Sequence, residues 1–192
     1  MRLRIPIFSL ILSLAAAGGL LARTREVPLE EIARRADSAV LAACTAARGI
    51  RAGTGGMIYT VYEFNRLETV AGAATGETFT LRVAGGTAGR YRVVLRDAPR
   101  FQPGQSYLLL LRRTVRDGSL LVAGATNGIA PVRVASETGK WEIALSRRQA
   151  AAAALKAANP GPEAAAATVA PAWRLLDEIR PLLRNAVGEV SQ

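Results

Sequence analysis

The sequence predicts a mainly β domain, a small barrel or sandwich, with one short helix before it and two helices after it. Short segments of alternating polar and apolar residues follow one another, and turn pairs separate them at Pro103-Gly104, Asp117-Gly118 and Asn127-Gly128. No helical pattern alternates with these segments. Half of the 192 residues are apolar, which is enough for one hydrophobic core.

Residues 1–22 have the order of an export signal. Arg2 and Arg4 form a basic start, an apolar run follows as far as Ala22, and small residues crowd its end. Signal peptidase recognises that order, so we expect cleavage after Ala17 or Ala22. The mature protein is then extracytoplasmic, periplasmic or secreted, with no transmembrane segment left. An uncleaved anchor is the alternative, because the run is near the roughly 20 residues that span a bilayer.

Residues 23–36 are expected to form a short helical segment ahead of the β domain. Pro28 fits the first position of a helix. Glu30 and Glu31 each precede an arginine by four residues, a spacing that allows ion pairs along one helix face. Acids early and arginines late also match the helix dipole.

Residues 37–145 are expected to form the β domain. The predicted strands cover residues 38–48, 57–70, 78–83, 90–96, 107–111, 120–123, 129–134 and 141–145. The alternation slips near Asn65-Arg66, which predicts a β-bulge there. Residues 107–111 are apolar on both faces, so this strand should be central. The predicted core is Val40, Ile58, Tyr62, Phe64, Phe79, Leu81, Val83, Val93, Tyr107, Leu109 and Leu111.

Residues 146–192 are expected to form an alanine-rich helical extension. A capping-box pattern at Ser146 opens the first helix, and a Pro-Gly-Pro stretch at 160–162 ends it. The second helix is expected from about Pro171, because apolar residues recur there at helical spacing. Pro181 should kink or split it.

The residue types that carry most catalysis are missing. The sequence has no histidine, and Cys44 is its only cysteine. The usual zinc sites and the Ser-His-Asp and Cys-His arrangements are therefore excluded. We expect no enzyme activity, no metal and no cofactor. Because one cysteine cannot form an internal disulfide, Cys44 is expected to be buried in a strand.

The net charge is +10, and arginines gather in the stretch from residue 82 to residue 116. In the strand predicted over 90–96, three arginines have the parity opposite to Tyr91, Val93 and Leu95, so they should face away from the core. A solvated arginine face is the alternative interpretation. The candidate anion- or partner-binding residues are Arg82, Arg90, Arg92, Arg96 and Arg100.

Three segments resemble the netrin-like module, the family that includes the tissue inhibitors of metalloproteinases. Residues 36–40 (ADSAV) are similar to the start of its first strand, 67–72 (LETVAG) to a strand end, and 101–109 (FQPGQSYLL) to its G-x-x-Y-L-L strand. The resemblance spans about residues 36–134. It implies a five-stranded barrel of the oligonucleotide/oligosaccharide-binding (OB) type with helical additions.

The chain departs from those inhibitors at the feature that makes them inhibitors. They chelate zinc through an amino-terminal cysteine that disulfides hold in place. Here no cysteine lies near the expected mature start, and no internal disulfide can form. No inhibitory residue can therefore be carried over.

Two functions follow from these observations. The first is an exported, non-catalytic binding or accessory module of the cell envelope that engages a protein partner, a metalloprotease being the case that the resemblance suggests. The second is an anion-binding barrel that takes acidic glycans or lipid head groups on its arginine-rich face. Export makes nucleic acid an unexpected target.

Overall fold

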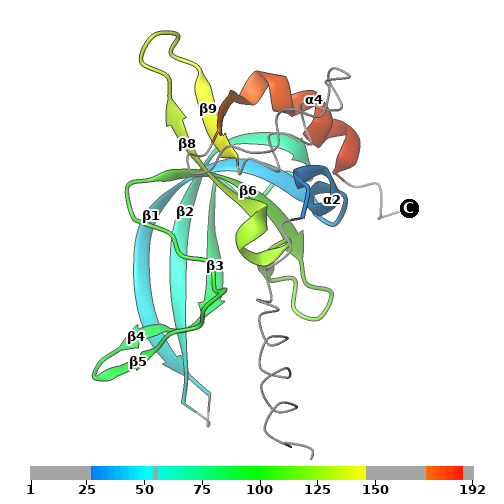
Figure 1. Cartoon of the computed structure of the whole chain (residues 1–192). Coiled ribbons are helices and arrows are strands. Elements are labelled where there is room, and N and C mark those ends of the chain that lie inside the picture. Colours follow the sequence, from blue (N-terminus) through cyan, green and yellow to red (C-terminus); the bar gives the residue numbers. More distant parts are fainter. Residues whose placement is uncertain (1–26, 54–55, 146–171, 188–192) are drawn as a thin grey trace, which may run out of the picture.

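A computed structural model describes residues 27–53, 56–145 and 172–187, and it is mainly β (Figure 1). The strands are β1 (Ser38–Ala52), β2 (Met57–Gly72), β3 (Thr78–Ala84), β4 (Gly86–Ala88), β5 (Tyr91–Val93), β6 (Ser106–Arg113), β7 (Leu120–Val122), β8 (Ile129–Val134), β9 (Trp141–Leu145) and β10 (Ala172–Leu175). Helices α2 (Leu29–Arg34) and α4 (Leu176–Ala186) and the 3-10 turn η2 (Ala125–Gly128) complete the described part.

One eight-stranded sheet dominates the structure. Its order is β10-β9-β8-β6-β1-β2-β3, β7 also pairs with β6, and β4 and β5 form a separate two-stranded sheet. The predicted bulge lies at Leu67: Leu41 pairs with Glu68 and Ala42 pairs with Arg66, which leaves Leu67 without a partner in the register. Bulges of this kind bend a strand and increase its twist, and the long β1 and β2 are curved in Figure 1.

The sheet has an apolar layer on each face. Residues 107–111 are all buried, as predicted for a central strand, and their alternate side chains point to opposite layers. Leu108 and Leu110 join the layer under α2 and α4, whereas Tyr107, Leu109 and Leu111 join the layer inside the curl of the sheet. Of the predicted core residues, Val83 is half-buried and Val93 is exposed, and all the others are buried.

The amino-terminal helix is confirmed. α2 follows Pro28, which occupies the N-cap, and its apolar side chains are buried against the sheet. Glu30 and Glu31 form the expected ion pairs with Arg34 and Arg35, at 2.8 and 2.6 Å. In Figure 1, α2 and α4 lie together on one side of the sheet.

The prediction of a small five-stranded OB-like barrel with three helices was wrong. The main sheet has eight strands and is not closed: among the described residues, β3 pairs only with β2, and β7 pairs only with β6. The spacing of turn signals predicts roughly how many strands there are. It does not predict whether the two edge strands of the sheet pair with each other to close a barrel. β8 and β9 extend the sheet beyond β6, where a barrel strand would curl back.

The carboxyl-terminal segment also differs from expectation. Ala172–Leu175 is a strand paired with β9, and the helix starts only at Leu176. Pro181 lies inside α4, which continues through it to Ala186. The export signal at 1–22 and the alanine-rich helix expected after Ser146 lie outside the described residues. In the part that is described, no helix is long and apolar enough to cross a membrane.

Candidate anion-binding cleft

The small hairpin of β4 and β5 lies against the far end of the long β1–β2 hairpin (Figure 1). Two hydrogen bonds hold it there. The backbone N–H of Gly85 donates to the carbonyl oxygen of Ile58 at 2.8 Å, and the Thr60 hydroxyl donates to the Gly85 carbonyl oxygen at 2.9 Å. Gly86 (φ +120°) leaves room for that hydroxyl, since a Cβ there would lie 2.0 Å from Thr60 Oγ1. The hairpin is therefore fixed to the sheet at its base.

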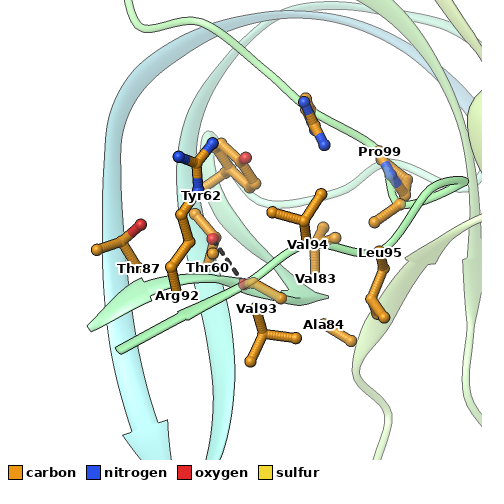
Figure 2. A pocket seen from close by; sticks show the side chains of 14 residues that line it. Thr60, Tyr62, Val83, Ala84, Thr87, Arg92, Val93, Val94, Leu95 and Pro99 are labelled. Carbon is orange, nitrogen blue, oxygen red and sulfur yellow. Dashed lines mark hydrogen bonds between the residues drawn. The ribbon is translucent and has the colours of Figure 1, made fainter. Parts of the chain in front are cut away.

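A cleft of about 220 Å³ opens between this hairpin, the sheet and the segment 94–100 that follows β5. Arg92 of β5 and Arg100 both line it, and hydroxyl groups come from Thr60, Tyr62 and Thr87. In Figure 2, the Arg92 side chain rises from β5 toward the sheet, in the direction of Tyr62. The lining contains no aspartate or glutamate.

The electrostatics of the cleft follow from that composition. Two guanidinium groups share one concave surface, and neither forms an ion pair with any residue in the described ranges. A guanidinium presents a planar array of N–H donors that matches carboxylate, sulfate or phosphate oxygens. The cleft is therefore suited to an anion.

The structure brings together only two of the five candidate arginines. Arg82 lies on β3 with its guanidinium 3.8 Å from the centre of the Tyr59 ring. Arg90 donates a hydrogen bond to the Tyr91 hydroxyl at 3.0 Å. Arg96 is exposed in the turn after β5 and does not line the cleft. Arg92 and Arg100 remain as the cleft pair.

The geometry predicted for residues 90–96 was wrong. β5 covers only Tyr91–Val93, pairs with β4, and has all three of its residues exposed. Period-two alternation places successive side chains on opposite faces of any strand, but it identifies the solvent face only when the other face packs on a core. Neither face of β5 does so. The predicted patch also required the strand of Arg92 to neighbour that of Arg82, whereas β5 pairs with β4 and β3 pairs with β2.

Exposed apolar side chains lie beside the arginines of this segment. Tyr91, Val93, Val94 and Leu95 are 43%, 41%, 58% and 44% exposed. Val93, Val94 and Leu95 also line the cleft. Figure 2 shows them on the chain that runs from β5 across the opening. One short segment thus supplies both a cation and an apolar surface.

An aromatic cluster anchors the segment 94–100 at its far end. Phe101 is buried, and its ring meets those of Tyr62, Phe64 and Tyr107 edge-on at 4.9, 5.0 and 5.2 Å. Tyr107 is a core residue, as predicted, and Phe101 belongs to the same buried cluster. Burial raises the pKa of the Tyr107 hydroxyl, which accepts a hydrogen bond from the Gln102 backbone at 2.9 Å.

Sequence reasoning missed the hydroxyl groups of the cleft. Tyr62 was assigned to the core, where its ring lies. Thr60 carried no signal, and Thr87 carried none beyond its place after Gly85-Gly86. Cys44 is buried in β1, as expected, and burial raises the pKa of its thiol. Within the described ranges, no group of three or more Cys, Asp or Glu side chains could hold a metal ion.

Comparison with known proteins adds no assignment to this cleft. No family model matches the chain, and no curated protein matches it. The resemblance to netrin-like modules stays a prediction from the three short segments that carry it.

Proposed function

We propose that the protein is an exported, non-catalytic binding module of the cell envelope, and that its ligand is an anion held in the cleft between Arg92 and Arg100. The observation that carries this proposal is the pairing of the two arginines in one cleft whose lining holds no carboxylate. The net charge of +10 supports it, because a cationic protein attracts anionic partners from a distance.

The chemistry of the cleft favours sulfate, phosphate or carboxylate groups. Two guanidiniums can each donate paired hydrogen bonds to such a group, and Tyr62 and Thr87 lie in the same lining, whereas the Thr60 hydroxyl already donates to the Gly85 carbonyl. Acidic glycans and anionic lipid head groups both carry these groups, and both are found where an exported protein resides. The absence of histidine from the sequence supports binding over catalysis.

A salt-dependent binding experiment tests the proposal. The probe is fluorescent dextran sulfate, and the variant combines Arg92→Ser with Arg100→Ser. The matched control combines Arg112→Ser with Arg116→Ser, which removes the same charge from exposed positions outside the cleft. We expect the cleft variant to bind at least tenfold more weakly than the control, because even one charge-assisted hydrogen bond contributes about 1.5–3 kcal/mol and about 1.4 kcal/mol corresponds to tenfold.

Three outcomes would contradict this proposal. Equal losses in both variants would mean that the probe responds to net charge alone. If the native protein does not bind dextran sulfate, or binds it equally at low and high salt, the arginines are only a solvated surface. The hypothesis that the module engages a protein partner is then favoured. Screening acts over about 8 Å at physiological ionic strength, so real binding through the arginines must weaken as salt rises.

The envelope location is a separate part of the proposal and rests on residues 1–22. Mass spectrometry of the envelope fraction should show a mature chain that starts between Gly18 and Arg25. A full-length chain in the cytoplasm would contradict it. A protease as partner stays a prediction of the resemblance alone.

A further inference from the structure

The exposed apolar residues beside the cleft need a physical explanation. Large apolar side chains normally cluster away from water, and singly exposed ones are ordinary. Here four of them fall within five consecutive positions, Tyr91, Val93, Val94 and Leu95, each more than two-fifths exposed. β5 buries none of its residues, so the segment gains nothing from the core of the domain.

Cations surround the same segment. Arg90 and Arg51 lie over the Tyr91 ring, with their guanidinium carbons 5.1 and 5.0 Å from its centre. Arg92 follows Tyr91 directly, and Arg100 lines the same cleft as Val93, Val94 and Leu95. The surface is therefore cationic and apolar at one place; no acidic residue lines the cleft itself, and the one acid of this segment is the exposed Asp97.

This combination discriminates between the two kinds of anion. A soluble acidic glycan would satisfy the arginines but leave four apolar side chains in water. A bilayer containing anionic lipids satisfies both, because arginines bind the head groups while apolar side chains enter the boundary with the acyl chains. Tyrosine is itself favoured at that interface, since its ring is apolar and its hydroxyl is polar.

We infer that the cleft takes the phosphate head group of an anionic phospholipid, and that Val94 and Leu95 enter the membrane surface beside it. The inference rests on the proposed function and names its ligand. The hydrogen bonds that hold the β4–β5 hairpin to β2 present this edge of the molecule as a fixed surface.

Vesicle sedimentation tests the inference with the processed chain recovered from the envelope. Vesicles of phosphatidylcholine alone are compared with vesicles that also contain phosphatidylglycerol. The apolar variant combines Val94→Ser with Leu95→Ser. Its matched control combines Val115→Ser with Leu121→Ser, two residues that are also exposed but lie outside the cleft. Thermal unfolding shows that each variant is folded.

We expect binding to the phosphatidylglycerol vesicles and little to phosphatidylcholine alone. The apolar variant should bind the anionic vesicles about tenfold more weakly, because burial of apolar side chains adds to the electrostatic attraction. Because both residues also line the cleft, dextran sulfate binding is measured in parallel, and it should fall much less than vesicle binding does. The control variant should match the native protein on both probes.

A second measurement covers the case in which the apolar variant fails to fold. Val94→Cys and Leu121→Cys each carry an environment-sensitive fluorophore, and the buried Cys44 is protected from labelling. The label at position 94 should shift to the blue with anionic vesicles, whereas the label at 121 should not.

The failures of the two proposals are distinguishable. If dextran sulfate binding needs Arg92 and Arg100 but the apolar variant binds vesicles normally, or the label at 94 stays in water, the lipid inference is wrong and the anion-binding function stands with a glycan as ligand. If neither dextran sulfate nor anionic vesicles bind, both proposals are wrong.

Discussion

Gly49 of β1 lies directly against Thr87 of β4: a Cβ at Gly49 would stand 1.6 Å from the Thr87 carbonyl oxygen. The φ angle of Gly49 is outside the left-handed region, so its conformation does not require glycine. Glycine is required at this position because the backbones of β1 and β4 approach too closely for any side chain. The hairpin that positions Arg92 thus rests on the β1 backbone.

Replacing Gly49 by Ala should therefore displace the hairpin and weaken anion binding while leaving the core intact. Alanine is otherwise acceptable in a strand, and the hairpin is exposed, so we expect unfolding free energy to fall by no more than about 1–2 kcal/mol. Dextran sulfate binding should fall clearly. The comparison is Gly89→Ala in the hairpin turn, where nothing lies within 4 Å of the new Cβ and only the strain of φ +58° is introduced, so it separates turn strain from the backbone clash at Gly49. Unchanged binding by the Gly49→Ala variant would show that the hairpin does not set the cleft.

Leu109→Ala should be strongly destabilising. Leu109 is fully buried on the central strand β6, within the apolar layer inside the curl of the sheet. Removing such a side chain costs about 2–5 kcal/mol through lost burial and the cavity left behind. Urea unfolding measures the loss. Leu121→Ala, on a side chain that is 38% exposed, should cost about 0.5 kcal/mol or less, and similar losses at both positions would contradict the described layer.

The turn between β6 and β7 should make stability depend on acid pH. Hydrogen bonds from the Thr114 hydroxyl and from the Ser119 hydroxyl and backbone lower the pKa of Asp117 to about 2. A carboxylate with a lowered folded-state pKa stabilises the protein above its unfolded pKa, and that contribution disappears as pH falls through the folded value. The melting temperature of Asp117→Asn should thus lie below that of the native protein at neutral pH. The difference should shrink as pH falls toward 2 and vanish below it, and a pH-independent difference would refute this explanation.

Much of the fold could be predicted from local pattern. The alternation of Phe79 and Leu81 with polar neighbours fixed the buried face of β3, and the unbroken apolar run 107–111 identified the central strand. Closure could not be predicted, because strand pairing between distant segments leaves no local trace. Ala172–Leu175 shows this: its residues fit helical spacing, yet pairing with β9 makes them a strand.

The candidate site was only partly predictable for a related reason. Arginine clustering pointed to the stretch of chain that contains Arg92 and Arg100. The alternation along 90–96 then led to a wrong prediction that one face of this strand packs on the core. Tyr91 and Val93 alternate with arginines, but they pack on no core. What brings Arg92 and Arg100 into one cleft is the contact of the hairpin with β1 and β2, which involves Gly49 and Gly85, and a close backbone approach has no periodic signature.

The most direct test of the central claim follows the two arginines themselves. In a nitrogen-15 NMR titration with sucrose octasulfate, a small soluble polyanion, the side-chain Nε–Hε signals of Arg92 and Arg100 should shift together and saturate at one ligand concentration. Those of Arg112 and Arg116 should move little. Shifts spread evenly over the exposed arginines, or confined to residues outside the cleft, would contradict an anion site between Arg92 and Arg100.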